Sequence, residues 1–217
     1  MPNKTKVSFV YENKEYNFIS PLLGEFNVEN LAESFLVCLS LGMKMGDLLK
    51  RLNGVKIAGR MESIDLGQDF YCLVDYAHTP NGIHRFMEFV KGLDVKRIIA
   101  ISGQAGGRDP YKRKDVGYEI ASKADLVIFT SEDPRFEDVD HIIDDMVQRL
   151  EGYDNYIRII DREEAIAYAI KIAEKKDLIC ILGKGAEDYM MIKDVRVPFS
   201  DVEVSKKYIQ KRLSKGK

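Results

Sequence analysis

Residues able to do chemistry recur at the ends of short apolar runs in this 217-residue chain. Leu73-Val74 is followed by Asp75 and His78, and later runs end in segments 103–109, 131–135, 161–162 and 183–188. In segment 131–135 (Ser-Glu-Asp-Pro-Arg), Glu132 and Asp133 could bind an ammonium group while Arg135 binds a carboxylate. Together these groups would clamp a zwitterion. The alternative interpretation is a capped turn with surface ion pairs.

Two of these segments are rich in glycine. In 103–109 (Gly-Gln-Ala-Gly-Gly-Arg-Asp) backbone N–H groups could approach an anion at a helix start, with Arg108, Lys112 and Arg113 adding positive charge. The alternative is a tight turn. Neither this segment nor Gly183-Lys184-Gly185 has the Lys-Ser/Thr ending of a phosphate-binding loop, and the glycine spacing is not that of a dinucleotide fingerprint. A nicotinamide-dependent dehydrogenase is therefore disfavoured.

The remaining acids and histidines give weaker signals. Asp161 is predicted to cap a helix, because acids follow it in the first turn. His78 could bind a ligand or satisfy the turn before the helix that begins at Thr79-Pro80. His84 and His141 have no His or Cys companions at metal-binding spacing, so we expect no protein-built metal site and assign no metal ligands.

The elements that position these residues are short apolar strands alternating with amphipathic helices. We expect strands at 70–74, 97–102, 126–130, 157–160 and 178–182, and helices at 80–91, 110–123, 139–150, 162–174 and 202–213. Repeated strand–helix units of this kind predict an α/β fold with a mostly parallel, doubly wound sheet. Because parallel strands end at the same edge of a sheet, the polar segments should form one site there.

The first 57 residues have a different pattern. Segments 5–11 and 15–20 alternate around a turn and predict a hairpin, followed by a connection at 21–27 and helices at 28–41 and 45–52. So few elements can enclose little core of their own. These residues are therefore expected to be either the end of a domain whose body is absent or a patch docked on the rest of the chain.

Composition excludes several classes of protein. A net charge of -2 predicts no attraction to nucleic acid or to membranes. The basic cluster near the C-terminus (Lys206, Lys207, Lys211, Arg212) alternates with apolar residues as on a solvated helix face. Three cysteines, an odd number, suggest free thiols in a reducing compartment. Without a signal peptide or an apolar span of membrane length, a cytoplasmic location is expected.

Four motifs, in this order and spacing, resemble those of the Mur ligases, most closely the UDP-N-acetylmuramoyl-tripeptide synthetases. Residues 24–30 (Gly-Glu-Phe-Asn-Val-Glu-Asn) resemble the family's Gly-x-Phe-Asn-x-x-Asn, and residues 59–62 its Gly-Arg-Met-Glu. Residues 75–80 are identical to its Asp-Tyr-Ala-His-Thr-Pro. Residues 183–189 match its Gly-Lys-Gly-His-Glu-Asp-Tyr except at Ala186.

The resemblance implies an incomplete version of a three-domain ligase. Residues 1–57 would be a small α+β remnant of the central ATPase domain, and residues 58–217 the complete Rossmann-like C-terminal domain with helices on both faces of its sheet. Family members use ATP and Mg²⁺ to phosphorylate the carboxylate of a UDP-muramoyl dipeptide, and the amine of an incoming amino acid then attacks the acyl phosphate.

The resemblance also implies site residues. Positions expected to serve ATP are Asn27, Asn30, Arg60, Asp75 and His78. Segment 132–135 falls on the family's Asp-Asn-Pro-Arg motif, which recognises meso-diaminopimelate. Positions expected to bind the amino acid are Arg108, Glu132, Asp133, Arg135, Gly183 and Glu187.

Three departures from the family pattern matter. No Gly-x-x-Gly-Lys-Thr/Ser loop occurs in the sequence, so we assign no catalytic residue and expect the lone chain neither to ligate nor to bind ATP or Mg²⁺ tightly. Glu132-Asp133 replaces Asp-Asn, and the added carboxylate would also suit the ammonium of lysine. Ala186 removes a ring that could have formed a hydrogen bond.

Two hypotheses follow. The first is a ligase fragment that works with a separate N-terminal portion on small substrates: an amino acid, diaminopimelate or lysine, with ATP and the UDP-muramoyl dipeptide. The alternative is a non-catalytic Mur-ligase-like binding or regulatory module.

Overall fold

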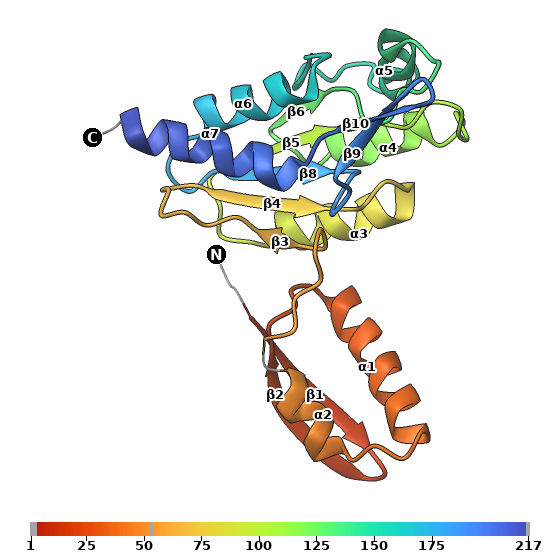
Figure 1. Ribbon diagram of the computed structural model, residues 1–217, viewed down its shortest axis with the longest axis vertical. Coiled ribbons are helices and arrows are strands. Elements are labelled where there is room, and N and C mark those ends of the chain that lie inside the picture. Colours follow the sequence, from red (N-terminus) through yellow and green to blue (C-terminus); the bar gives the residue numbers. More distant parts are fainter. Residues whose placement is uncertain (1–3, 53, 216–217) are drawn as a thin grey trace. The chain divides into compact units, whose positions relative to one another are not determined.

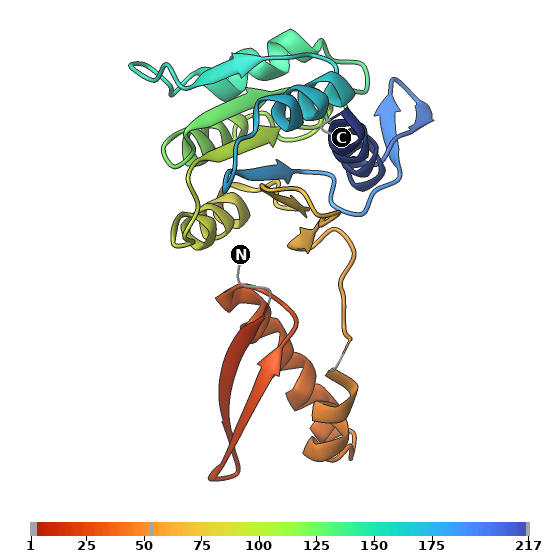
Figure 2. The same ribbon diagram turned by 90° about the vertical axis from the view of Figure 1, so that its left-hand side faces the viewer.

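The computed structural model describes residues 4–52 and 54–215 and divides the chain into two compact units, 1–57 and 58–217. Figures 1 and 2 show the elements of both. Within the described residues, none of the helices combines the length and the apolar character that a membrane span requires.

The first unit is a hairpin packed against two helices. Strands β1 (Thr5–Tyr11) and β2 (Lys14–Ser20) pair antiparallel, and helices α1 (Glu25–Ser40) and α2 (Met45–Leu52) follow. Helix α1 begins three residues earlier than predicted, directly after Gly24 in a left-handed conformation (φ 88°). The unit has a small core after all, because Phe35, Met45, Leu48 and Leu52 are buried together.

The second unit is built on a six-stranded sheet with the order β3-β4-β8-β5-β6-β7. Five strands are parallel and β3 is antiparallel, which confirms the mostly parallel α/β fold. The strands of this sheet are β3 (Glu62–Ser63), β4 (Tyr71–Asp75), β5 (Ile98–Ser102), β6 (Leu126–Phe129), β7 (Tyr156–Arg158) and β8 (Leu178–Leu182). All residues of β5 and β8 are buried, as expected for central strands covered on both faces.

Helices cover both faces of this sheet. They are α3 (Pro80–Lys91), α4 (Arg113–Ala121), α5 (Val139–Val147), α6 (Arg162–Ile172) and α7 (Asp201–Lys215). Figure 2 shows α3 and α4 on one side of the sheet, and α6 and α7 on the other. Helix α4 begins three residues later than predicted, since 110–112 form a turn before it.

One hydrophobic core lies between the sheet and the α6–α7 layer. Every second residue of the central strands faces this layer, for example Ile99 and Ile101 of β5, and meets Ile166 and Ile170 of α6. The sequence analysis missed two features of the unit: the short strand β3 and an antiparallel hairpin of β9 (Tyr189–Ile192) and β10 (Val195–Pro198).

Candidate functional site

The polar segments that follow the parallel strands meet at the carboxyl edge of the sheet in the second unit. The carbonyl of His78 accepts hydrogen bonds from Gln104 Nε2 (3.3 Å) and Lys112 Nζ (3.1 Å), which joins the first segment to the glycine-rich one. The amide of Gly106 donates to the carbonyl of Asp133 at 2.9 Å, and that of Gly183 donates to the carbonyl of Asp75 at 3.1 Å. The predicted convergence is confirmed.

Glycine is required where these segments touch. A Cβ on Gly106 would lie 2.0 Å from the carbonyl oxygen of Pro134, and one on Gly59 would lie 1.9 Å from the amide nitrogen of Ala186. Gly59 also has a φ of +63°, a conformation in which side chains are strained. The glycines of the two motif segments 59–62 and 183–189 thus serve close backbone packing.

Asp75 uses its carboxylate within the protein. Its oxygens accept hydrogen bonds from the amides of Met61 and Ala77, each at 2.8 Å. Burial raises the pKa of Asp75, although these amides and the charge of Arg60 oppose the change. The carboxylate therefore fixes the segment 59–62 against the end of β4.

The residues beside Asp75 form the exposed border of the site. The guanidinium of Arg60 lies 4.6 Å from the centre of the Tyr76 ring, and Arg60 itself is exposed. His78 Nδ1 lies 2.8 Å from the carbonyl oxygen of Tyr76, so the ring satisfies the turn, and Thr79 caps α3 through the amide of Gly82.

Lys184 joins two of the predicted amino-acid-binding acids. Its fully buried ammonium group lies 2.7 Å from Asp133 Oδ1 and 2.9 Å from Glu187 Oε2. Burial alone would lower the pKa of Lys184, but the hydrogen bonds to the two carboxylates raise it. Asp133 Oδ1 also accepts from the amide of Met191, so this acid ties the 131–135 segment to β9.

Glu132 differs from these acids because its Oε2 atom is buried without a hydrogen-bond partner among the described residues. This oxygen faces Gly183, where a Cβ would approach it to 2.4 Å. Burial raises the pKa of Glu132 to about 7, against the opposing charges of Arg162 and Lys184. Buried carboxyls left unsatisfied in this way are unusual and often belong to functional sites.

Backbone hydrogen bonds to the β9–β10 hairpin fix the position of Arg135. Its amide donates to the carbonyl of Met191 at 3.0 Å, and its carbonyl accepts from the amide of Lys193 at 2.8 Å. Its φ is 53°, in the left-handed region that a residue other than glycine seldom adopts. The side chain is half-buried, and its Nε has no partner among the described residues. The hairpin β9–β10 therefore fixes the backbone of Arg135.

Arg162, which the sequence analysis read only as part of a cap, is a buried clamp. Its guanidinium forms two bonds of 2.8 Å with Asp201 at the start of α7, and donates to the carbonyls of Ser131 and Leu182. Both charged side chains are fully buried. Asp161 caps α6 by accepting from the amide of Glu164, as predicted.

The expectation that Arg113 adds positive charge to the glycine-rich segment is wrong. Arg113 is buried, and its guanidinium pairs with Glu137 and Asp145 and donates to the carbonyl of Ala105. Arg108 is exposed in the same segment, and Lys112 is bonded to His78 as described above. The interpretation of Glu132 and Asp133 as surface ion pairs is also wrong, because both residues are buried.

Lys184 was given no role from the sequence, although its segment was compared with a phosphate-binding loop and with a Mur ligase motif. A lysine between two glycines, followed by an acid three residues later, was the available signal. Among the described residues, no group of three or more His, Cys, Asp or Glu side chains could hold a metal ion.

Two of the predicted nucleotide positions, Asn27 and Asn30, belong to the first unit. Asn27 is buried and donates to the carbonyl of Leu23 at 2.7 Å, so its amide group stabilises the start of α1. Asn30 is exposed on the same helix. Asn30 and Arg60 are exposed, whereas the side chains of Asn27 and Asp75 are engaged within the protein.

Comparison with known proteins identifies the family. Residues 59–185 match the family described as Mur ligase, glutamate ligase domain. This chain belongs to that family. It is 36% identical over 207 residues to the UDP-N-acetylmuramoyl-L-alanyl-D-glutamate--2,6-diaminopimelate ligase of Rickettsia rickettsii, covering 94% of this chain and 42% of that protein. The enzyme of the same name from Fusobacterium nucleatum subsp. nucleatum is 38% identical over 204 residues, covering 93% of this chain and 42% of that protein.

Solved structures agree with this assignment. A ligase of the same name superposes with a TM-score of 0.70 at 32% identity, covering 96% of this chain and 43% of that one. The MurF ligase from Thermotoga maritima in complex with ADP has a TM-score of 0.67 at 14% identity, covering 100% of this chain and 45% of that one. At this identity the likeness shows the fold alone. The chain thus spans less than half the length of the relatives it matches.

Proposed function

We propose that this chain is the amino-acid-binding part of an ATP-dependent amide-bond ligase, which adds meso-diaminopimelate or lysine to UDP-N-acetylmuramoyl-L-alanyl-D-glutamate in peptidoglycan synthesis. The observation that carries the proposal is the convergence of Glu132, Asp133, Arg135, Gly183 and Glu187 on one edge of the sheet in a member of the Mur ligase family. The similarity to ligases named for 2,6-diaminopimelate supports the substrate class.

The residues of this edge have separate tasks in the proposal. Arg135 and the exposed Arg108 bind carboxylate groups of the incoming amino acid. Glu132, whose Oε2 has no partner in the described part of the chain, accepts a hydrogen bond from an ammonium group. Lys184 holds Asp133 and Glu187 in place, so that they orient the loop without adding two free negative charges. Fixing the amine in this way aligns it for attack on an activated carboxylate.

For ATP, the proposal assigns Arg60 and His78 in the second unit. The positions expected in the first unit, Asn27 and Asn30, are a separate proposal. When bound, ATP supplies the phosphoryl group that activates the acceptor carboxylate, and it requires Mg²⁺. Residues 1–57 are proposed to be the end of the central ATPase domain. The phosphate-binding loop would come from an N-terminal portion, because none occurs in these 217 residues.

Calorimetry tests the amino-acid site directly. We expect meso-diaminopimelate or lysine to bind the chain and Arg135→Ala to abolish that binding. Arg149→Ala is the matched control, because Arg149 is an exposed arginine that pairs with Asp115 and lies outside segment 131–135. If wild-type protein binds neither amino acid nor an ATP analogue, the non-catalytic module becomes the better interpretation. Ligation restored by a separately expressed N-terminal portion would extend the proposal to the whole reaction.

A further inference from the structure

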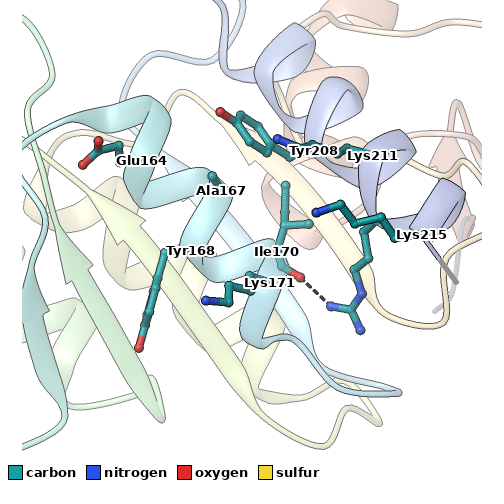
Figure 3. Close-up of a pocket in the computed structure, with 9 residues that line it drawn as sticks. Glu164, Ala167, Tyr168, Ile170, Lys171, Tyr208, Lys211 and Lys215 are labelled. Atoms are coloured by element: carbon teal, nitrogen blue, oxygen red, sulfur yellow. Dashed lines mark hydrogen bonds between the residues drawn. The ribbon is translucent and has the colours of Figure 1, made fainter.

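A groove of about 550 Å³ lies between α6 and α7, lined by residues that the proposed function does not use. Figure 3 shows Tyr168 and Lys171 on α6, with Lys215 extending from α7 toward Ile170. The volume is in the range of small-molecule sites, which are roughly 300–1,000 Å³.

The lysines of α7 differ in whether they form ion pairs and in whether they line this groove. Lys206 pairs with Glu203 and Lys207 pairs with Glu163, so the charges of these two residues are already balanced. Lys211 and Lys215, one turn apart on α7, form no ion pair with any described residue, although the ammonium of Lys211 lies 5.6 Å from the Tyr208 ring. The two unpaired α7 lysines therefore line the groove, and the paired ones do not.

The α6 side of the groove adds to this charge. Lys171 is exposed and forms no ion pair with any described residue, and Arg212 donates to the carbonyl of Ile170 while its guanidinium lies 4.9 Å from the Phe70 ring. Among the described residues, the lining holds four cationic side chains and one acid, Glu164, in a chain whose net charge is -2. This local excess of positive charge calls for an anionic ligand.

The groove also offers an aromatic wall. Tyr168 is 38% exposed and lies three residues from Lys171, so both side chains project from the same face of α6. Ala167 and Ile170 form the apolar surface beside it. A planar ring can stack on a tyrosine face while phosphate groups bind ammonium groups nearby.

We propose that the α6–α7 groove binds a nucleoside phosphate, with its phosphates on Lys171, Lys211 and Lys215 and its base against Tyr168. A simple inorganic anion would leave the aromatic and apolar surface unused. A long nucleic acid strand is opposed by the negative charge of the whole chain, and the groove volume corresponds to one ligand of nucleotide size.

The test is calorimetric titration of the full chain with ADP, pyrophosphate and adenosine at low ionic strength. We expect ADP to bind, and the double variant Lys171→Ala/Lys215→Ala to weaken its binding by at least roughly tenfold. Lys91→Ala/Lys206→Ala is the matched control, since it removes the same charge from an exposed and a half-buried position outside the groove and should leave ADP binding unchanged.

Other outcomes separate this groove from the proposed ATP site. Binding that survives Arg60→Ala but weakens in Lys171→Ala/Lys215→Ala, with pyrophosphate and adenosine each weaker than ADP, supports the groove as a nucleotide site. The proposal is overturned if ADP does not bind, if Lys171→Ala/Lys215→Ala leaves its affinity unchanged, or if pyrophosphate binds as tightly as ADP.

Discussion

Replacing Arg162 by alanine should strongly destabilise the second unit. The guanidinium of Arg162 makes two bonds of 2.8 Å to Asp201, and both side chains are fully buried. Removing one partner of a buried ion pair costs about 3–5 kcal/mol, because the other charge stays buried without compensation. The variant also leaves the carbonyls of Ser131 and Leu182 without this donor. Against a typical domain stability of about 5–15 kcal/mol, a loss of this size is about a fifth or more of the total.

Native-state hydrogen exchange of the amides of Ile179, Cys180 and Ile181 measures this loss, because they lie in the fully buried central strand β8. Exchange there reports on opening of the second unit whatever the first unit does. The control is Arg158→Ala, whose partner Asp144 lies 2.7 Å away on the surface, and which should cost less than about 1 kcal/mol.

A double variant sharpens the test. Arg162→Met combined with Asp201→Leu removes both buried charges and should recover part of the stability that Arg162→Ala loses. If Arg162→Ala costs no more than Arg158→Ala, or if the double variant is less stable than Arg162→Ala, the description of Arg162 as a buried clamp is wrong.

Two further predictions concern the carboxyl edge. Folding raises the pKa of Glu132 from its ordinary 4.5 to about 7, so between these pH values the folded state keeps a proton that the unfolded state loses. The free energy of unfolding therefore falls by roughly 3 kcal/mol as pH rises through this range. The stability of Glu132→Gln relative to wild type, followed by urea unfolding, should therefore rise from pH 4.5 to above 7, and a constant difference would argue against it. Gly59→Ala should lower the free energy of unfolding by about 3 kcal/mol, because its Cβ would overlap the backbone of Ala186. Gly67→Ala should lower it by about 1 kcal/mol, because Gly67 has a φ of +88° but its Cβ would meet open space. Equal thermal shifts for the two glycine variants would contradict the close packing.

Much of the fold could be predicted because local and tertiary preferences agree in it. Helix α3 runs from Pro80 to Lys91 as predicted, since Thr79 caps it and its apolar spacing matches the buried face. The strand at 178–182 is apolar throughout, as a central parallel strand should be. Strand β3 has only two residues, too few for any periodicity, and β10 is exposed along its whole length, so neither shows a hydrophobic pattern.

The candidate site could be located but not detailed from the sequence. Strand ends marked the edge, and the prediction that their loops converge there is confirmed. Ion pairs between segments that are distant in the sequence decide which charged side chains of the site remain available to bind a ligand. Lys184 pairs with Asp133, which is 51 positions away in the sequence, and Arg113 pairs with Asp145, which is 32 positions away. Such pairs follow from how the loops pack against one another, which spacing along the chain does not reveal.

The most direct test of the amino-acid site is nuclear magnetic resonance titration of the isotopically labelled chain with meso-diaminopimelate and with lysine. We predict saturable amide shifts that appear together at Gly106, Arg135 and Lys184, from three segments joined only at the carboxyl edge. Shifts confined to residues outside segments 75–78, 103–109, 131–135 and 183–188, or the absence of shifts with either amino acid, would contradict the assignment of this edge as the amino-acid site.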